Sequence, residues 1–155
     1  MRKRKRAVMF DIHAMRASEI GTAAALSLSV FGHEAWKEKD LREALSGGHA
    51  RLYSAESEEG SLAGYAVFYS AADEGELNSI AVNPSYRRMG VAGGLLAAAI
   101  SDLTAGGVAK IFLEVREHNA PAISFYEKNG FLAAGVRKHF YDHPEEDAIV
   151  MVKTL

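Results

Sequence analysis

The chain has 155 residues, 48% of them hydrophobic and 25% charged, which is the size and composition of one globular domain. A formal net charge of −2 argues against a general polyanion-binding protein. The absence of cysteine excludes disulfides, thiolate metal sites and a cysteine nucleophile. No apolar run approaches the roughly 18 residues that a membrane span needs, so we expect a cytoplasmic protein without a membrane partner.

Residues 1–6 differ in composition from residues 7–155. Residues 2–6, RKRKR, form a basic block that we expect to be a solvated, disordered tail. A nucleic-acid-binding arm is the alternative, and the net acidic charge of the chain disfavours it. Residues 7–155 contain neither an internal repeat nor a linker, and we expect them to form a single domain.

Hydrophobic periodicity and turn residues predict the helices and strands. In chain order these are a strand at 8–12, helices at 18–31 and 40–45, strands at 50–55, 63–70 and 76–82, a helix at 90–105, a strand at 111–115, a helix between Asn119 and Asn129, and strands at 131–141 and 148–153. In the first helix, Ser18 is the expected N-cap. Its expected apolar stripe comprises Ile20, Ala24, Leu28 and Phe31.

The strand at 111–115 follows a crossover helix and should therefore lie parallel to the strand that ends at Val82. The three strands between residues 50 and 82 are joined by short turns and should form an antiparallel meander. The predicted fold class is therefore α/β (α+β), with a mixed, mostly antiparallel sheet of six or seven strands and about four helices on both faces.

A glycine-rich turn with two arginines, RRMGVAGG at residues 87–94, opens the helix at 90–105. Unpaired backbone N–H groups at a helix start, together with arginine charge, form a cradle for an anion such as a phosphate. A P-loop is excluded, because Leu95 and Leu96 stand where Lys and Ser or Thr are needed. The dinucleotide-binding spacing G-x-G-x-x-G is also absent.

Two motifs resemble those of the GNAT acyltransferase family. Arg87, Gly90 and Ala92 have the spacing R-x-x-G-x-A, which in that family holds the pyrophosphate of acetyl-CoA. Residues 113–131, LEVREHNAPAISFYEKNGF, match the family form L-E-V-x-x-x-N-x-x-A-x-x-x-Y-x-x-x-G-F. The match is most similar to the RimI-type branch, the N-terminal alanine acetyltransferases of ribosomal protein S18, and it covers the chain from about residue 77 onward.

This resemblance implies the GNAT fold, with acetyl-CoA as cosubstrate. It implies a bulge in the strand that carries residues 77–82, so that the main chain at Ile80, Ala81 and Val82 faces the pantetheine arm. The remaining residues that it assigns to acetyl-CoA are Arg87, Arg88, Met89, Gly90, Val91, Ala92, Gly93 and Asn119. Those that it assigns to the acceptor are Phe31, Trp36 and Tyr141.

Glu114 and Tyr126 are the expected catalytic residues. Acyl transfer to an amine needs a base for the amine and an acid for the leaving thiolate. Glu114 is the candidate base, directly or through water; the alternative is a surface carboxylate paired with Arg116 or Lys110. Tyr126 is the candidate acid, and its ring is also expected to pack beside Ile123, since a tyrosine can bury its ring and keep its hydroxyl in a cleft.

Histidines offer two further readings. His139 and His143, with Asp142 and Glu145, have metal-binding side chains, but a strand-to-turn segment does not place both imidazoles on one face, so no metal is expected. His118 is an alternative proton acceptor. The chain also departs from the branch: Ala35 and Lys37 flank Trp36 where Pro and Ser or Thr are usual, and Ala92 stands where Gly is commoner.

The leading hypothesis is an acetyl-CoA-dependent Nα-acetyltransferase that transfers the acetyl group directly, in a ternary complex, to a protein N-terminus such as the alanine of a ribosomal protein. An α-amino group is about a third neutral at cytoplasmic pH and a lysine about 0.1%, so a single carboxylate suffices for the former. A GNAT acetyltransferase for a small amine or a lysine side chain would use the same residues. The alternative from another class is a noncatalytic CoA-binding or RNA-associated module that uses the basic tail.

Overall fold

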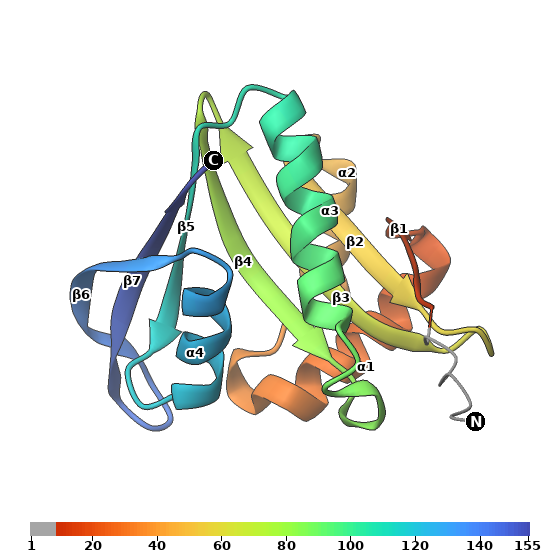
Figure 1. Cartoon of the computed structure of the whole chain (residues 1–155). Coiled ribbons are helices and arrows are strands. Elements are labelled where there is room, and N and C mark those ends of the chain that lie inside the picture. Colours follow the sequence, from red (N-terminus) through yellow and green to blue (C-terminus); the bar gives the residue numbers. More distant parts are fainter. Residues whose placement is uncertain (1–8) are drawn as a thin grey trace, which may run out of the picture.

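The structure is a computed structural model that describes residues 9–155. The basic block at residues 1–6 lies outside the described residues. A seven-stranded sheet in the order β1-β2-β3-β4-β5-β7-β6 has helices on both faces (Figure 1). Its strands are β1 (Asp11–Ala14), β2 (Ala50–Glu56), β3 (Leu62–Ala71), β4 (Glu74–Val82), β5 (Lys110–Arg116), β6 (Leu132–Tyr141) and β7 (Glu146–Thr154). The helices are α1 (Ile20–Phe31), α2 (Glu38–Ser46), α3 (Val91–Ala105) and α4 (Ala120–Lys128), with short 3₁₀ turns η1 (Ala17–Glu19), η2 (Gly32–Glu34) and η3 (Pro84–Tyr86).

The predicted fold class is confirmed. All neighbouring strands pair antiparallel except β4 and β5, which pair in parallel across the α3 crossover as expected. Among residues 9–155, no helix is both long and apolar enough to cross a membrane. In the strand order of the sheet, the parallel pair β4–β5 lies near the centre, and β7 and β6 follow beyond β5.

One core lies between the sheet and α3, which crosses in front of β2–β4 in Figure 1. The α3 residues Leu95, Leu96, Ala99 and Leu103 are buried there, as their helical spacing predicts, while Ile100 is only partly buried. Residues of α4 and the chain after it, including Tyr126 and Phe131, belong to the same core.

A second core lies on the opposite face, beneath α1 and α2. The predicted stripe of α1 is wrong in part, because the buried residues are Ile20, Ala23, Leu26 and Ser27, whereas Leu28 is 63% exposed. The hydroxyl oxygen of Ser27 accepts a hydrogen bond from the backbone N–H of Trp36 at 2.8 Å, which keeps this polar residue on the buried side of the helix.

The start of the chain also differs from the prediction. The first strand is Asp11–Ala14, later than the predicted 8–12, of which Val8 lies outside the described residues. Phe10 packs edge-to-face on Tyr86, with ring centroids 5.8 Å apart, instead of pairing with β2. Ser18 is not an N-cap, because η1 precedes α1 and the carboxylate of Glu19 accepts from the backbone N–H of Arg16 at 2.9 Å.

Candidate active site

The sheet opens between its two parallel strands. β4 and β5 pair over three positions only, from Glu74 opposite Lys110 to Glu76 opposite Phe112, and then separate (Figure 1). β4 continues to Val82 and β5 to Arg116 without further pairing between them. Among the described residues, the β4 edge at 77–82 thus has no strand partner on its β5 side, and the carboxyl ends of parallel strands are where α/β sheets bind ligands.

A bulge in β4 changes the face of the sheet to which the residues after it point. The register of β4 against β3 shifts between Val67–Ser79 and Phe68–Leu77, which leaves Asn78 as the extra residue. Leu77 and Ala81 would share a face in a regular strand, yet they lie in the two opposite cores. The predicted bulge in the strand at 77–82 is therefore confirmed, and it directly precedes the segment Ile80, Ala81 and Val82.

The glycine-rich turn forms the expected start of α3. Arg88 and Gly90 have positive φ angles of 63° and 82°, and the first helical hydrogen bond runs from the N–H of Gly94 to the carbonyl of Gly90 at 2.9 Å. Among the described residues, the backbone N–H groups at 88–93 have no backbone acceptor. They lie at the helix N-terminus, where the backbone dipoles add positive potential.

The side chains around this turn leave it open. Arg87, Arg88 and Met89 are exposed, and a Cβ added at Gly93 would meet no atom within 4 Å. By contrast, a Cβ at Gly94 would lie 2.6 Å from the Cδ1 atom of Ile12, so Gly94 serves packing of α3 against β1. The turn therefore offers free donors, positive charge and access for an anion.

Glu114 lies on β5 at the edge of the opening. Alternate residues of β5 are buried in the α3 core, so Glu114 points to the α1–α2 face of the sheet. Its carboxylate pairs with the guanidinium of Arg137 at 3.2 Å. The alternative from the sequence, an ion pair of Glu114 with Arg116 or Lys110, is not what the structure shows. Lys110 pairs with Glu74 at 3.2 Å, and Arg116 pairs with Glu34 and Glu146.

Glu76 of β4 lies on the same face as Glu114. Burial and then the neighbouring Glu114 carboxylate raise the pKa of Glu76 above its usual value. The sequence did not single out Glu76 or Arg137. Glu76 could have been found from the strand alternation and the parallel pairing of β4 with β5, whereas Arg137 lies on an irregular part of β6, with register shifts on either side.

Tyr126, on α4, lies on the α3 face of the sheet, opposite to the face of Glu114. Its ring packs edge-to-face between Phe125 and Phe131, with centroids 5.4 and 5.6 Å away, and it is 8% exposed. Burial, with a smaller contribution from Tyr141, raises its pKa well above the usual value. The burial that the sequence predicted for the Tyr126 ring is thus confirmed, with Phe125 and Phe131 as its ring neighbours, and the phenol is held in its protonated form.

Asn119 begins α4 as predicted. Its side-chain oxygen accepts from the backbone N–H of Ala122 at 3.3 Å, and Pro121 lies in the first turn. The helix ends at Asn129, and Gly130 follows with φ 89°. These caps fix the position of Tyr126 in the core beneath α3.

Two of the three predicted acceptor residues, Phe31 and Trp36, lie at and just after the end of α1. Trp36 lines a cleft of about 270 Å³, and its ring lies 6.5 Å from that of Tyr69. The residues lining the cleft are Glu34, Ala35, Trp36, Asp40, Glu43 and Tyr69, so Phe31 is not among them. Phe31 is partly buried against the α1–α2 core instead.

Arg116 joins this cleft to Tyr141. Its guanidinium pairs with Glu34 next to the cleft and with Glu146 of β7 at 2.9 Å, and it lies 4.5 Å from the centroid of the Tyr141 ring. Burial and nearby carboxylates, Glu34 first, raise the pKa of Tyr141 to about 12. No local sequence pattern predicts this network, because its members come from four elements, η2, β5, β6 and β7.

The histidines are placed apart from one another. His139 pairs with Glu145, and the ring of His143 stacks on His33 with centroids 4.0 Å apart, so these two histidines form no common ligand set. His118 is exposed and its Nδ1 lies 3.0 Å from the Glu146 carboxylate.

Comparison with known proteins identifies the family. The profile of the Acetyltransferase (GNAT) family matches residues 19–131. The ribosomal protein bS18-alanine N-acetyltransferase of Escherichia coli (strain K12) is 39% identical over 118 residues, which cover 75% of this chain and 78% of the relative. The chain therefore belongs to the GNAT family of acetyltransferases, and it is an N-acetyltransferase.

Solved structures agree with this assignment. The crystal structure of the ribosomal-protein-S18-alanine N-acetyltransferase from Escherichia coli matches with a TM-score of 0.84 and 32% identity over 94% of each chain. Ard1 from Thermoplasma volcanium shares the fold with a TM-score of 0.85 at 22% identity, over 94% of this chain and 97% of that chain. The family predicted from the sequence motifs is thus confirmed.

Proposed function

We propose that this enzyme transfers the acetyl group of acetyl-CoA directly to the α-amino group of a protein N-terminus, and that its acceptor is an N-terminal alanine like that of ribosomal protein S18. The observation that carries this proposal is the opening between β4 and β5, which has an anion cradle at one end, with Glu114 and Tyr126 on opposite faces of the sheet. The name of the Escherichia coli relative supports the choice of acceptor.

The cradle would hold acetyl-CoA. The free N–H groups at 88–93 and the charges of Arg87 and Arg88 suit the pyrophosphate. The unpaired β4 edge at Ile80, Ala81 and Val82 would pair with the amides of the pantetheine arm, as a strand would, and Asn119 would contact that arm from α4. An N–H of this edge would also polarise the thioester carbonyl.

Glu114 would accept the proton of the acceptor amine, directly or through water. The neutral nitrogen then attacks the thioester carbon, the carbon–sulfur bond breaks, and Tyr126 gives its proton to the departing thiolate. The acylated nitrogen loses its remaining extra proton to water, and the tyrosinate of Tyr126 regains a proton from water. Because burial raises the pKa of Tyr126, the proton transfer from Tyr126 must accompany thiolate departure rather than precede it. Glu114 must also exchange its ion pair with Arg137 for the amine.

The cleft beside Trp36 would receive the acceptor chain. Glu34, Asp40 and Glu43 make it acidic, which suits a cationic N-terminus before its proton is removed. Tyr141, held by Arg116, would support the peptide main chain from the other side.

A panel of short peptides that differ only in the N-terminal residue tests this proposal. The enzyme with acetyl-CoA should acetylate the Ala peptide, with lower kcat/KM for other N-termini and none for a peptide whose α-amine is blocked. Turnover of small amines without turnover of any N-terminal peptide would overturn the proposal. Loss of acetyl-CoA binding as well would refute the assignment of the cradle.

A further inference from the structure

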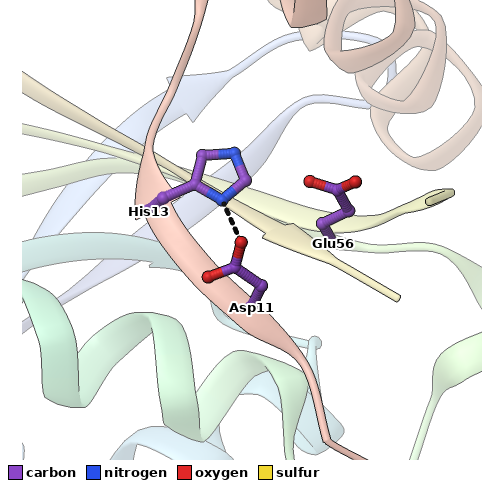
Figure 2. A group of neighbouring side chains, drawn as sticks. All are labelled: Asp11, His13 and Glu56. Carbon is purple, nitrogen blue, oxygen red and sulfur yellow. Dashed lines mark ion pairs between the residues drawn. The ribbon is translucent and has the colours of Figure 1, made fainter. Parts of the chain in front are cut away.

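A histidine and two carboxylates converge at the edge of the sheet where β1 pairs with β2 (Figure 2). Asp11 and His13 lie two residues apart on β1 and therefore share a face. Glu56 is the cross-strand neighbour of Asp11. One possible ligand atom from each of the three residues lies within 4.8 Å of the other two. None of these residues belongs to the candidate active site.

The ring of His13 is oriented by a carboxylate from another element. Its Nε2 lies 3.0 and 3.1 Å from the two carboxylate oxygens of Glu19 in η1, so this nitrogen is assigned the proton. Nδ1 then carries the lone pair. A carboxylate that accepts from the far nitrogen of an imidazole fixes the tautomer and raises the basicity of the other nitrogen, as it does in many metal sites.

The Nδ1 atom of His13 faces the carboxylate of Asp11 without a hydrogen bond (Figure 2). It is buried and has no hydrogen bond, although the Oδ2 atom of Asp11 lies only 3.3 Å away. A lone pair that faces a carboxylate oxygen needs a positive group between the two. Glu56 is no better neutralised, since its described cationic neighbour, Arg16, is 3.7 Å from its carboxylate.

The three ligand types favour a particular class of ion. One imidazole and two carboxylates suit Zn²⁺ and similar divalent transition metals better than Ca²⁺ or Mg²⁺, which prefer oxygen alone. Two ligands about 2.0 Å from a tetrahedral ion lie about 3.3 Å apart. The spacing of Asp11 and His13 already has this value.

Access and adjustment are also possible at this place. The side chain of Asp11 is 69% exposed and that of Glu56 is 31% exposed, so both can rotate by the small amount that a common ion requires. Both residues line a groove of about 340 Å³, which gives an ion access to the two carboxylates.

We propose that Asp11, His13 and Glu56 form a binding site for one divalent transition-metal ion of the zinc type, with Glu19 as the residue that orients His13. The ion would cross-link the edge strand β1 to β2, and these two strands otherwise pair over only four positions. Since metal ligands must converge in the folded chain, binding stabilises the fold. The site shares no residue with the acetyl-transfer machinery, so zinc should change stability rather than turnover.

Calorimetric titration of the tag-free full chain with ZnCl₂ tests this inference. The wild type should bind one Zn²⁺ per chain and gain thermal stability. The exposed carboxylates allow two variants that should fold normally, Asp11→Asn and Glu56→Gln, and each should weaken binding by about tenfold or more. His49→Asn is the matched control, because His49 is an exposed histidine at the start of β2 outside the cluster, and it should bind as the wild type does.

Cobalt provides an independent readout of the nitrogen ligand. Co²⁺ should give visible absorption bands in the wild type and in His49→Asn, and these should disappear in His13→Asn. Zinc binding that is absent from the wild type, or that is equal in the wild type and in the Asp11→Asn/Glu56→Gln double variant, would overturn the proposal. Neither result would bear on acetyl transfer, which is measured separately.

Discussion

The carboxylate of Glu114 has two neighbours with opposite effects. The guanidinium of Arg137 pairs with it at 3.2 Å, whereas the Glu76 carboxylate lies close enough for the two carboxylates to repel, which helps to raise the pKa of Glu76. On the opposite face of the sheet, Tyr126 is buried and protonated. These single-residue environments carry the chemical part of the proposed mechanism.

Replacing Glu114 by Gln tests its role as base. The amide keeps the shape but cannot accept the proton, so kcat/KM should fall by about 100-fold or more with little change in Tm. Steady-state kinetics with the Ala peptide measure this. Glu74→Gln is the control, because Glu74 has the same side chain on the neighbouring strand and pairs with Lys110 away from the opening. Equal activity of Glu114→Gln and Glu74→Gln would remove Glu114 from the mechanism.

The pH dependence of kcat/KM tests the protonation of Tyr126. Activity should rise as the acceptor amine loses its proton, with a midpoint near its pKa of about 8. A free tyrosine would then lose its proton near pH 10. Because burial raises the pKa of Tyr126, the plateau should extend beyond about pH 10 without a fall. A descending limb with a midpoint below about pH 10 would contradict protonated Tyr126 as the acid, provided that the fold persists by circular dichroism.

The raised pKa of Glu76 predicts how the stability of the fold depends on pH. Its pKa is raised in the folded protein, so the folded state binds the proton more tightly than the unfolded state does, and ionisation of Glu76 destabilises the fold as pH rises. Glu76→Gln should therefore match the wild type near pH 4 and exceed its Tm near pH 8. The gain should stay below about 1 kcal/mol, because the side chain is only partly buried. A Tm difference that does not change with pH would show that the pKa of Glu76 is not raised in the folded protein.

At the scale of elements, Gly64 of β3 and Gly93 of α3 have different roles. A Cβ at Gly64 of β3 would lie 2.7 Å from the carbonyl of Ala81 and 2.9 Å from the side chain of Val91. The missing side chain at Gly64 therefore allows β4 and the start of α3 to approach β3 closely. Gly93, in the first turn of α3, has no such neighbour, since a Cβ added there would meet no atom within 4 Å.

The variants Gly93→Ala and Gly64→Ala should therefore behave differently. Gly93→Ala should keep or slightly raise Tm, since alanine is a better helix former by about 1 kcal/mol, while KM for acetyl-CoA rises. Gly64→Ala should lower stability by about 1–3 kcal/mol through overpacking. Thermal melts and acetyl-CoA titrations separate the two effects. An unchanged KM in Gly93→Ala would place the pyrophosphate elsewhere.

Sequence patterns predicted these elements well where local signals were strong. The Asn119 cap, the Gly130 terminus of α4 and the parallel placement of β5 all follow from residue type and connection length. The α1 stripe was partly wrong, because Ser27 is buried to satisfy a backbone N–H nine residues away, which no helical period reveals. The Arg116 cluster was missed for the same reason, since its contacts span 26 to 82 residues of sequence.

At the scale of the whole molecule, the topology of the sheet makes the site. The α3 crossover forces β4 and β5 to lie parallel, and their early separation opens the sheet near its centre (Figure 1). In the proposed mechanism the cradle would come from the connection between β4 and α3, the base from β5, the acid from α4, and acceptor contacts from the α1–α2 connection and the β6–β7 hairpin. The zinc-type site lies instead where β1 pairs with β2, at the far edge of the same sheet.

The central claim is that the enzyme acts on an α-amine, and one peptide can test it. The peptide carries an N-terminal alanine and an internal lysine, and tandem mass spectrometry after incubation with acetyl-CoA locates the acetyl group. We expect acetylation of the alanine nitrogen alone, because the lysine amine is almost fully protonated at neutral pH and a single carboxylate serves as base. Acetylation of the lysine with the alanine left free would contradict the claim.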